Sequence, residues 1–180
     1  VRAVRVEPEV VLARDNLSLD LDSLLRGGPS LNSLIETFRQ EWAEAVRPTH
    51  TLLLYGPDLQ VAALDIESKY SEAALGAVQL ADLRNFAHGR HNWLSRRGAD
   101  TAVVALYTDR DRELAESTLS LLPPRFRVAR VHVPSEGATA RIIGLVAGFY
   151  LVADAGAARR VDPGRPHVAM FGRRIYHLNA

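Results

Sequence analysis

The sequence predicts an α/β fold, a three-layer α/β/α sandwich built on a mainly parallel sheet. Three short apolar runs, Thr51–Tyr55, Ala102–Tyr107 and Val128–Val133, are typical of buried strands. Segments with apolar residues at helical spacing separate these runs, and such alternation is typical of a parallel sheet that helices cover on both faces. Because crossovers between parallel strands are right-handed, we expect the three runs to form adjacent parallel strands.

Composition limits the classes of partner and compartment. The chain has 180 residues, enough for one ordinary domain. Its formal net charge of +1 indicates neither a nucleic-acid partner nor a membrane surface. It contains no cysteine, so we expect no disulfide and no cysteine-bound metal, which is compatible with the cytoplasm. The apolar run Ile142–Ala153 is shorter than the roughly 20 residues of a membrane span, and it predicts a buried helix.

Breaks in the pattern divide the chain into three parts. Residues 1–28 are expected to be an N-terminal arm or lead-in that ends at the Gly27-Gly28-Pro29 break. Residues 29–160 are expected to form the single α/β domain, and residues 161–180 a C-terminal tail. Since the chain begins with Val1 and not with methionine, we expect a piece of a longer protein or a processed chain.

Local signals predict where the other elements begin and end. Ser30 is a suitable N-cap for a helix that Pro48 ends. Asp58 is expected to cap the helix after the first strand, and Thr108 or Asp109 the helix after Tyr107. The remaining expectations are a very short strand at Ala77–Leu80, a broken helical region from Ala81 to Arg97 and a long apolar helix from Ser135 and Glu136 to about Ala157.

The carboxyl ends of the predicted strands are the first places to seek a ligand, because parallel α/β sheets bind ligands there. Gly56, directly after Tyr55, lets a ligand approach the backbone, although an ordinary strand-to-helix turn has the same composition. Lys69 and Glu72 share one face of the next helix. They are either an acid/base set or a plain ion pair on the surface.

Two histidines follow that helix and also allow two interpretations. His88 beside Gly89 is either a catalytic group or part of a helix C-cap. His88 and His91 could contribute to a zinc site, but the sequence indicates no third ligand. We therefore expect no metal and no cofactor.

The central stretch resembles a known family. The run from Leu64 to Glu72 carries Lys-x-x-Glu, comes after a strand that ends at Gly56, and precedes His88-Gly89. In order and spacing this is similar to the second half of a double sugar-isomerase (SIS) domain, as in glucosamine phosphate synthases and phosphosugar deaminases and deglycases. The tail motif Asp162-Pro163-Gly164-Arg165-Pro166 resembles that family's Asp-x-Asp-x-Pro-Arg tail. The resemblance covers roughly Thr49 to the C-terminus and implies a flavodoxin-like, SIS-type sheet.

The resemblance implies an activity and its residues. Glu72 would be the base that moves a proton between adjacent sugar carbons, Lys69 an electrostatic helper and His88 the residue that opens the sugar ring. Gly56, Arg90, His91 and Arg165 are the candidates for binding the sugar phosphate. A homodimer, or pairing with a second SIS lobe, would complete the site. We expect Glu72, Lys69 and His88 to converge near the carboxyl end of Thr51–Tyr55, with His88 serving either its own or a neighbour's cleft.

Departures from the family pattern keep two functions open. The Ser-x-Ser-Gly phosphate loop is absent, and the corresponding helix start reads Thr108-Asp109-Arg110-Asp111. Arg90 stands where the family usually has proline, and Asn85 where it commonly has glutamate. The chain is therefore predicted to be an isomerase or deaminase lobe that works with a partner. The alternative is a phosphosugar-binding or dimerisation module without catalysis.

Overall fold

A computed structural model describes residue 25 and residues 28–178 of the chain, so most of the predicted N-terminal arm lies outside the described residues. Its sheet has four parallel strands in the order β2-β1-β3-β4. The strands are β1 (His50–Tyr55), β2 (Ala77–Asp82), β3 (Thr101–Thr108) and β4 (Arg127–Val133). This confirms the predicted α/β fold, the three adjacent strands and the short strand that begins at Ala77.

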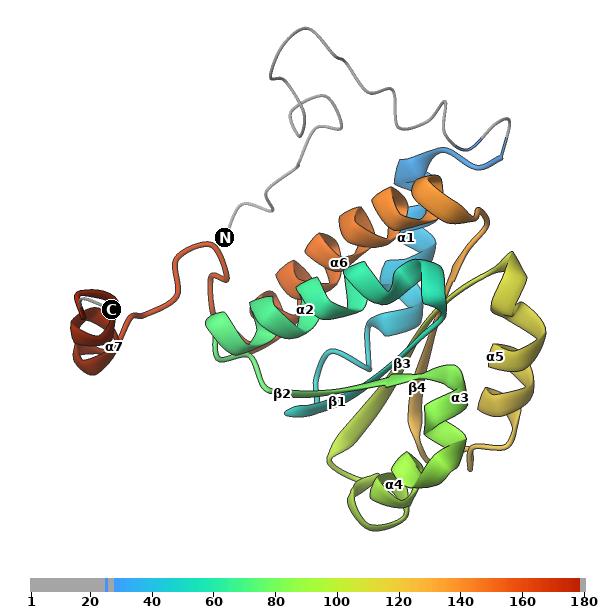
Figure 1. The fold of residues 1–180 in the computed structure, drawn as a ribbon, viewed down its shortest axis with the longest axis horizontal. Coiled ribbons are helices and arrows are strands. Elements are labelled where there is room, and N and C mark those ends of the chain that lie inside the picture. Colours follow the sequence, from blue (N-terminus) through green and yellow to red (C-terminus); the bar gives the residue numbers. More distant parts are fainter. Residues whose placement is uncertain (1–24, 26–27, 179–180) are drawn as a thin grey trace, which may run out of the picture.

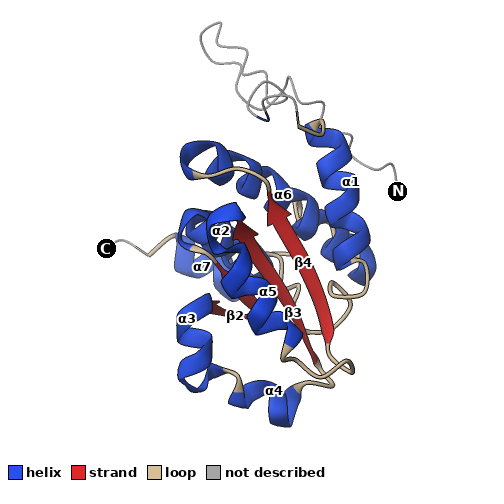
Figure 2. Ribbon diagram, turned by 90° about the vertical axis from the view of Figure 1, so that its right-hand side faces the viewer, coloured by secondary structure: helices blue, strands red, loops and turns tan. Residues whose placement is uncertain are grey.

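Helices cover both faces of the sheet, as Figures 1 and 2 show. One face carries α1 (Leu31–Trp42), α2 (Gln60–Glu72) and α6 (Gly137–Arg159), and the other carries α3 (Leu83–Asn85), α4 (Asn92–Arg97) and α5 (Arg112–Ser120). Successive residues of β3 point to opposite layers: Val104 and Leu106 join the core under α6, whereas Val103 and Tyr107 join the other core. All eight residues of β3 are buried, as expected for a central strand covered on both sides.

The short elements complete the chain order. Three-residue 3₁₀ turns, at Pro57–Leu59 and Asp109–Asp111, follow β1 and β3. A π-helical segment, Phe86–Arg90, lies between α3 and α4 and confirms the predicted broken helical region. The tail ends in α7 (Met170–Tyr176), which stands apart from the sandwich in Figure 1.

The structure separates correct from wrong cap predictions. Ser30 caps α1 as predicted, since its hydroxyl oxygen accepts from the backbone N–H of Ser33 at 3.2 Å. However, α1 ends at Trp42, before Pro48. The prediction that Asp58 caps α2 is wrong, because the Asp58 carboxylate instead accepts from the backbone N–H of Gly137 at the start of α6. No side chain caps the turn after β3 either, because the Thr108 hydroxyl donates to Asp111.

The predicted long apolar helix is α6, and it is a core element. By length and composition alone this helix could cross a membrane. However, half of its most apolar stretch is buried inside the protein. Gly144 and Gly148 allow α6 to approach α2 closely, since a Cβ on Gly144 would lie 2.6 Å from Leu59 Cδ2 and one on Gly148 3.0 Å from Ile66 Cγ1. This close packing explains why α6 is apolar around most of its circumference.

Candidate functional site

The carboxyl edge of the sheet is the expected ligand site, and a buried aspartate occupies it. Asp58 follows β1, is 6% exposed, and accepts from Gly137 N at 3.1 Å. Two guanidinium groups also approach its carboxylate, Arg141 at 3.4 Å and Arg110 at 3.8 Å. A helix N-terminus with two arginines would suit a phosphate group, but in this chain the Asp58 carboxylate already fills that position.

A second aspartate closes the approach to Gly56. The Thr108 hydroxyl donates to Asp111 Oδ2 at 3.2 Å, and a Cβ built on Gly56 would lie 2.1 Å from the same oxygen. Gly56 therefore permits a close approach to its backbone, as the sequence suggested. The group that makes this approach in the single chain is the Asp111 carboxylate.

A third group of polar side chains lies where β3 and β4 end. His132 Nε2 lies 2.7 Å from Asp109 Oδ1, and its ring stacks on Tyr107 with the centroids 5.4 Å apart. The Tyr107 hydroxyl donates to Glu116, which also accepts from Arg130. The Tyr107 hydrogen bond lowers the pKa of Glu116, while burial raises the pKa of Tyr107. These groups thus satisfy one another at the surface of the sheet.

Together these contacts make the carboxyl edge a poor phosphate site within one chain. Asp58, Asp109 and Asp111 place negative charge where a phosphate group would have to sit, and each already has a partner of its own. A phosphate would be repelled and would have to displace these contacts. The family resemblance predicted that the phosphate loop is missing, and these three aspartates lie at the edge where a phosphate would be expected to bind.

Lys69 and Glu72 lie in the last turns of α2, and they do not bind each other. Lys69 Nζ donates to Asp65 Oδ1 at 2.9 Å and lies 5.3 Å from the centroid of the Phe149 ring. Glu72 is exposed and accepts from the Ser68 hydroxyl at 2.9 Å. The Glu72 carboxylate is therefore accessible to a second molecule. The Lys69 ammonium, in contrast, is held by Asp65, on the side of Lys69 that points away from Glu72 along the helix.

The histidine segment follows β2 at the carboxyl edge. Asp82 caps α3 by accepting from the backbone N–H groups of Arg84 and Asn85, and the bond from Asn85 is the main cause of its lowered pKa. His88 is exposed, and Gly89 after it has a φ of 102°, a backbone conformation that favours glycine. This geometry matches the interpretation of the pair as the end of a helix.

The two neighbouring candidates in this segment are also on the surface. The His91 ring nitrogen Nδ1 lies 3.2 Å from the Phe86 carbonyl oxygen, and Arg90 is exposed. Among the residues that the structure describes, no three His, Asp or Glu side chains gather as metal ligands.

Chain direction keeps Glu72 and His88 apart in one chain. Helix α2 begins after the carboxyl end of β1, and its 13 residues return to the amino end of β2. That path is about 20 Å long, and the strand that follows returns the same distance to the edge where His88 lies. One chain therefore does not bring Glu72, Lys69 and His88 into one cleft. A shared site would need a second lobe or subunit.

Arg165, the tail candidate, lies in a tight turn after α6. Asp162 forms this turn by accepting from the backbone N–H groups of Gly164 at 2.9 Å and Arg165 at 3.1 Å. The Arg165 side chain is exposed. It lies beyond the end of α6 and away from the carboxyl edge of the sheet.

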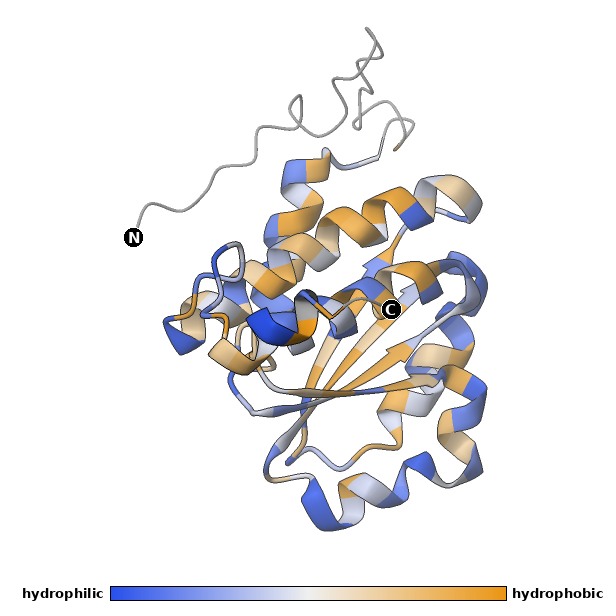
Figure 3. Ribbon diagram, turned by 60° about the vertical axis from the view of Figure 1, so that its left-hand side comes forward, coloured by the Kyte–Doolittle hydropathy of each residue, from blue (hydrophilic) through white to orange (hydrophobic). Residues whose placement is uncertain are grey.

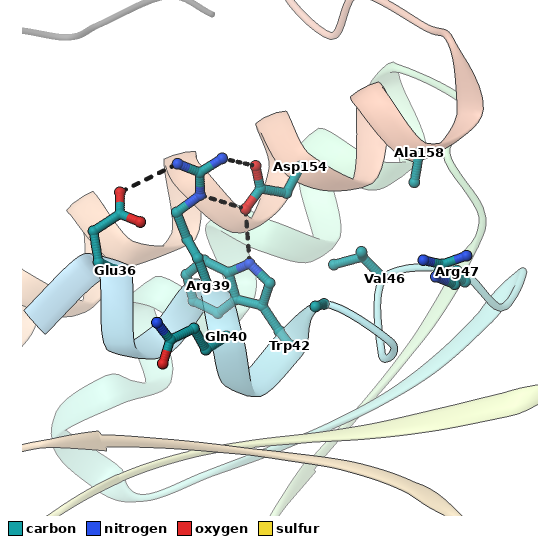
Figure 4. A pocket seen from close by; sticks show the side chains of 9 residues that line it. Glu36, Arg39, Gln40, Trp42, Val46, Arg47, Asp154 and Ala158 are labelled. Carbon is teal, nitrogen blue, oxygen red and sulfur yellow. Dashed lines mark hydrogen bonds and ion pairs between the residues drawn. The ribbon is translucent and has the colours of Figure 1, made fainter.

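A pocket lies between α1 and α6, and none of the predicted site residues lines it. It measures about 760 Å³, and Figure 4 shows Arg39 and Trp42 of α1 directed at Asp154 of α6. Two nitrogens of Arg39 and Trp42 Nε1 each lie 2.9 Å from the Asp154 carboxylate. Because these charges satisfy one another, we interpret the cluster as a bridge between helices.

The sequence contained a signal for one of the two bridging aspartates, Asp154, and none for the other, Asp58. Asp154 is the single charged residue from Ile142 to Ala158, so a partner on another helix was to be expected. Asp58 resembled an ordinary cap, and no local pattern indicated that its partner would be Gly137.

The chain has an SIS-like α/β fold, which it shares with two solved structures. A solved structure from Clostridium difficile 630, titled a "putative phosphosugar isomerase", has a TM-score of 0.56 at 13% identity over 81% of this chain. A "putative phosphosugar isomerase involved in capsule formation" from Bacteroides fragilis NCTC 9343 has a TM-score of 0.53 at 10% identity over 88% of this chain.

The match to this chain covers different shares of the two solved structures. The match covers 44% of the Clostridium protein and 92% of the Bacteroides protein. No protein-family model and no curated protein sequence matches the chain. The comparisons thus confirm the SIS-like fold, and the correspondence to the second lobe of a double domain stays a prediction.

Proposed function

We propose that this chain is a phosphosugar isomerase or deaminase lobe whose active site is shared with a second lobe or subunit. In this proposal Glu72 is the base, and the partner supplies the cradle for the phosphate. The observation that carries this proposal is a difference between the two edges of the sheet. The Asp58 carboxylate fills the carboxyl edge, whereas Glu72 is exposed at the end of α2, near the opposite edge.

The chemistry of an isomerase suits an exposed glutamate that a partner then covers. Proton transfer beside a carbonyl group needs a carboxylate base, and a nearby cation stabilises the enediolate. Lys69 is one turn from Glu72 and could rotate from Asp65 when a sugar phosphate arrives. His88, Arg90, His91 and Gly56 follow strand ends at the carboxyl edge and would serve a neighbour's cleft. Arg165 would contact the phosphate from the tail. A cytoplasmic setting belongs to the same proposal, because charged sugar phosphates cross bilayers poorly.

The second candidate is a phosphosugar-binding or dimerisation module without catalysis. The contact between Lys69 and Asp65 favours it, because the cation expected beside the base is already neutralised in the single chain. The two candidates differ in one measurable property, the exchange of a sugar proton with solvent.

The test uses a matched pair of glutamates on one helix. Glu72 accepts from Ser68 Oγ at 2.9 Å, and Glu67 accepts from Ser71 Oγ at 3.0 Å. The purified chain, alone and with its native partner lobe, is incubated in D₂O with a panel of hexose and hexosamine phosphates. Nuclear magnetic resonance then follows deuterium entering the carbon beside the carbonyl group.

We expect Glu72→Gln to reduce deuterium exchange at least about a thousandfold with sugar-phosphate binding nearly unchanged, since shape is kept and basicity is lost. Glu67→Gln should exchange at the wild-type rate. Binding without exchange in the wild type would support the module without catalysis, and equal exchange in Glu72→Gln would remove Glu72 as the base.

A further inference from the structure

Two regions expose large apolar side chains that no other described residue covers. The first is the tail, where five of them are between 51% and 74% exposed: Val168, Met170, Phe171, Ile175 and Leu178. These five occupy only a short stretch around α7. Leaving so much apolar surface in water is unfavourable, so we expect this segment to be covered.

The second region, here called the outer face, lies on the side of α2 and α6 that points away from the sheet. It comprises Val61 and Leu64 of α2, which are 51% and 49% exposed, and Phe149 of α6, which is 41% exposed. Lys69 connects the two helices across this face by lying over the Phe149 ring. In Figure 3 the ribbon of α6 is mainly orange, as expected for its apolar composition.

The two regions carry opposite charge. From residue 163 to residue 178 the tail contains Arg165, Arg173 and Arg174 and neither aspartate nor glutamate. Helix α2 carries Asp65, Glu67 and Glu72 against a single Lys69. The tail is therefore apolar and basic, whereas the outer face is apolar and acidic. Opposite charges around apolar contacts favour association between two such surfaces.

The start of the tail directs α7 away from its own outer face. A Cβ on Gly156 would lie 2.6 Å from Pro163 Cγ, so the first tail residues pack tightly against the end of α6. The Asp162 turn and the two prolines that flank Arg165 then fix the direction of the chain. In Figure 1, α7 accordingly lies beyond the helices and does not fold back along them.

We propose that α7 of one copy of this chain docks on the outer face of a second copy, and that the two copies exchange their tails. The exchange would cover both apolar regions and would place the arginines of one copy beside the glutamates of the other. This proposal rests on the proposed function in one respect, namely that the chain requires a second lobe or subunit. Its contacts and its tests are independent of any sugar phosphate.

Disulfide cross-linking tests the proposal directly because the chain has no cysteine. Leu64→Cys and Phe171→Cys are prepared in separate full-length chains, mixed and oxidised. We expect a covalent dimer that contains one chain of each kind. Leu121→Cys is the control, since Leu121 is 83% exposed on another layer, and its mixture with Phe171→Cys should give no cross-link.

The chain that carries both cysteines tests whether a tail docks on its own body. If it oxidises to a cross-linked monomer and the mixed single variants do not join, the tail covers its own outer face and the exchange is wrong. If the mixed chains join, docking is between copies.

Light scattering supplies a second measurement without cysteines. We expect Phe171→Asp and Leu64→Asp each to weaken the dimer at least about tenfold, because each places a charge in an apolar contact. An unchanged dimer in both single variants would overturn the proposal. So would a monomer that binds vesicles of phosphatidylserine and phosphatidylcholine through its tail, because α7 would then be a membrane anchor.

Discussion

Asp58 and Gly137 are 79 positions apart in the chain, and the carboxylate of the first accepts the backbone N–H of the second at 3.1 Å. This bond joins the end of β1 to the start of α6 at the edge where parallel sheets bind ligands. A side chain thus occupies the position that a phosphate group takes in many proteins with a helix N-terminus at this edge. The contact explains both a source of stability and the lack of a phosphate site in the single chain.

Asp58→Ala should lower the free energy of unfolding by about 2 kcal/mol, because it leaves Gly137 N–H and Arg141 without their acceptor and removes the ion pair with Arg110. Urea denaturation measures the change. The matched control is Asp100→Ala, which removes an exposed ion pair with Arg97 and should cost less than about 0.5 kcal/mol.

The same variant allows a rescue experiment. Sulfate or phosphate should stabilise Asp58→Ala more than the wild type, because the anion can bind where the carboxylate was. Equal stabilisation of both proteins by the anion would show that Arg110, Arg141 and Gly137 N–H do not form an anion site.

Gly76→Ala should destabilise the fold by about 2 kcal/mol or more. Gly76 has a φ of 153°, and a Cβ there would lie 2.4 Å from the Thr49 carbonyl oxygen, so backbone would have to move at the start of β1 and β2. Gly172→Ala is the control, since its Cβ would meet only Val168 at 3.8 Å. Thermal unfolding of the two variants should differ clearly, and equal melting temperatures would contradict the prediction.

Asp154→Ala should cost about 2 kcal/mol, because Trp42 Nε1 is buried and would lose its acceptor together with Arg39. Glu36 contacts the same arginine at 3.3 Å but is exposed, so Glu36→Ala should change stability by less than about 0.5 kcal/mol. Urea denaturation with tryptophan fluorescence measures both. A small effect of Asp154→Ala would mean that the bridge between α1 and α6 contributes little.

Glu116 should make stability depend on acid pH. Its hydrogen bond from Tyr107 lowers its folded pKa below the ordinary value of 4.5, so its contribution is present above pH 4.5 and is lost as the pH falls through the folded pKa. Glu116→Gln should therefore reduce stability at pH 7 and flatten the loss of stability below pH 4.5. Denaturation at several pH values gives the slopes, and Glu113→Gln, an exposed change on the same helix, should keep the wild-type slope.

At alkaline pH the partner of Glu116 should act in the opposite direction. Burial raises the folded pKa of Tyr107 above its ordinary value of 10, so the folded state holds the tyrosine proton more tightly. The contribution of Tyr107 is present below pH 10 and is lost as the pH rises further. Tyr107→Phe should weaken this alkaline loss, and ultraviolet titration of tyrosine provides the check.

The sequence alone determined the layers of the fold. The apolar runs of β1, β3 and β4 and the apolar helix α6 follow from burial, and burial leaves a periodic pattern in the chain. Ser30 was predictable as a helix cap because the capping interaction is local: its hydroxyl oxygen accepts from the backbone N–H of Ser33, only three residues away. The order of the motifs around Lys69 and Glu72 indicated the SIS-like fold that the structural comparisons confirm.

Tertiary structure decided which groups meet. Helix geometry offers Lys69 two carboxylates, Asp65 one turn before it and Glu72 one turn after, and the ammonium takes Asp65 beside the Phe149 ring of α6. The direction of α2 sets Glu72 and His88 at opposite edges of the sheet, and no local pattern reports this separation. Asp58 takes Gly137 as its partner because folding brings two distant segments to one edge. Periodicity records which residues are buried, whereas the choice of partner depends on the three-dimensional arrangement of elements far apart in the sequence.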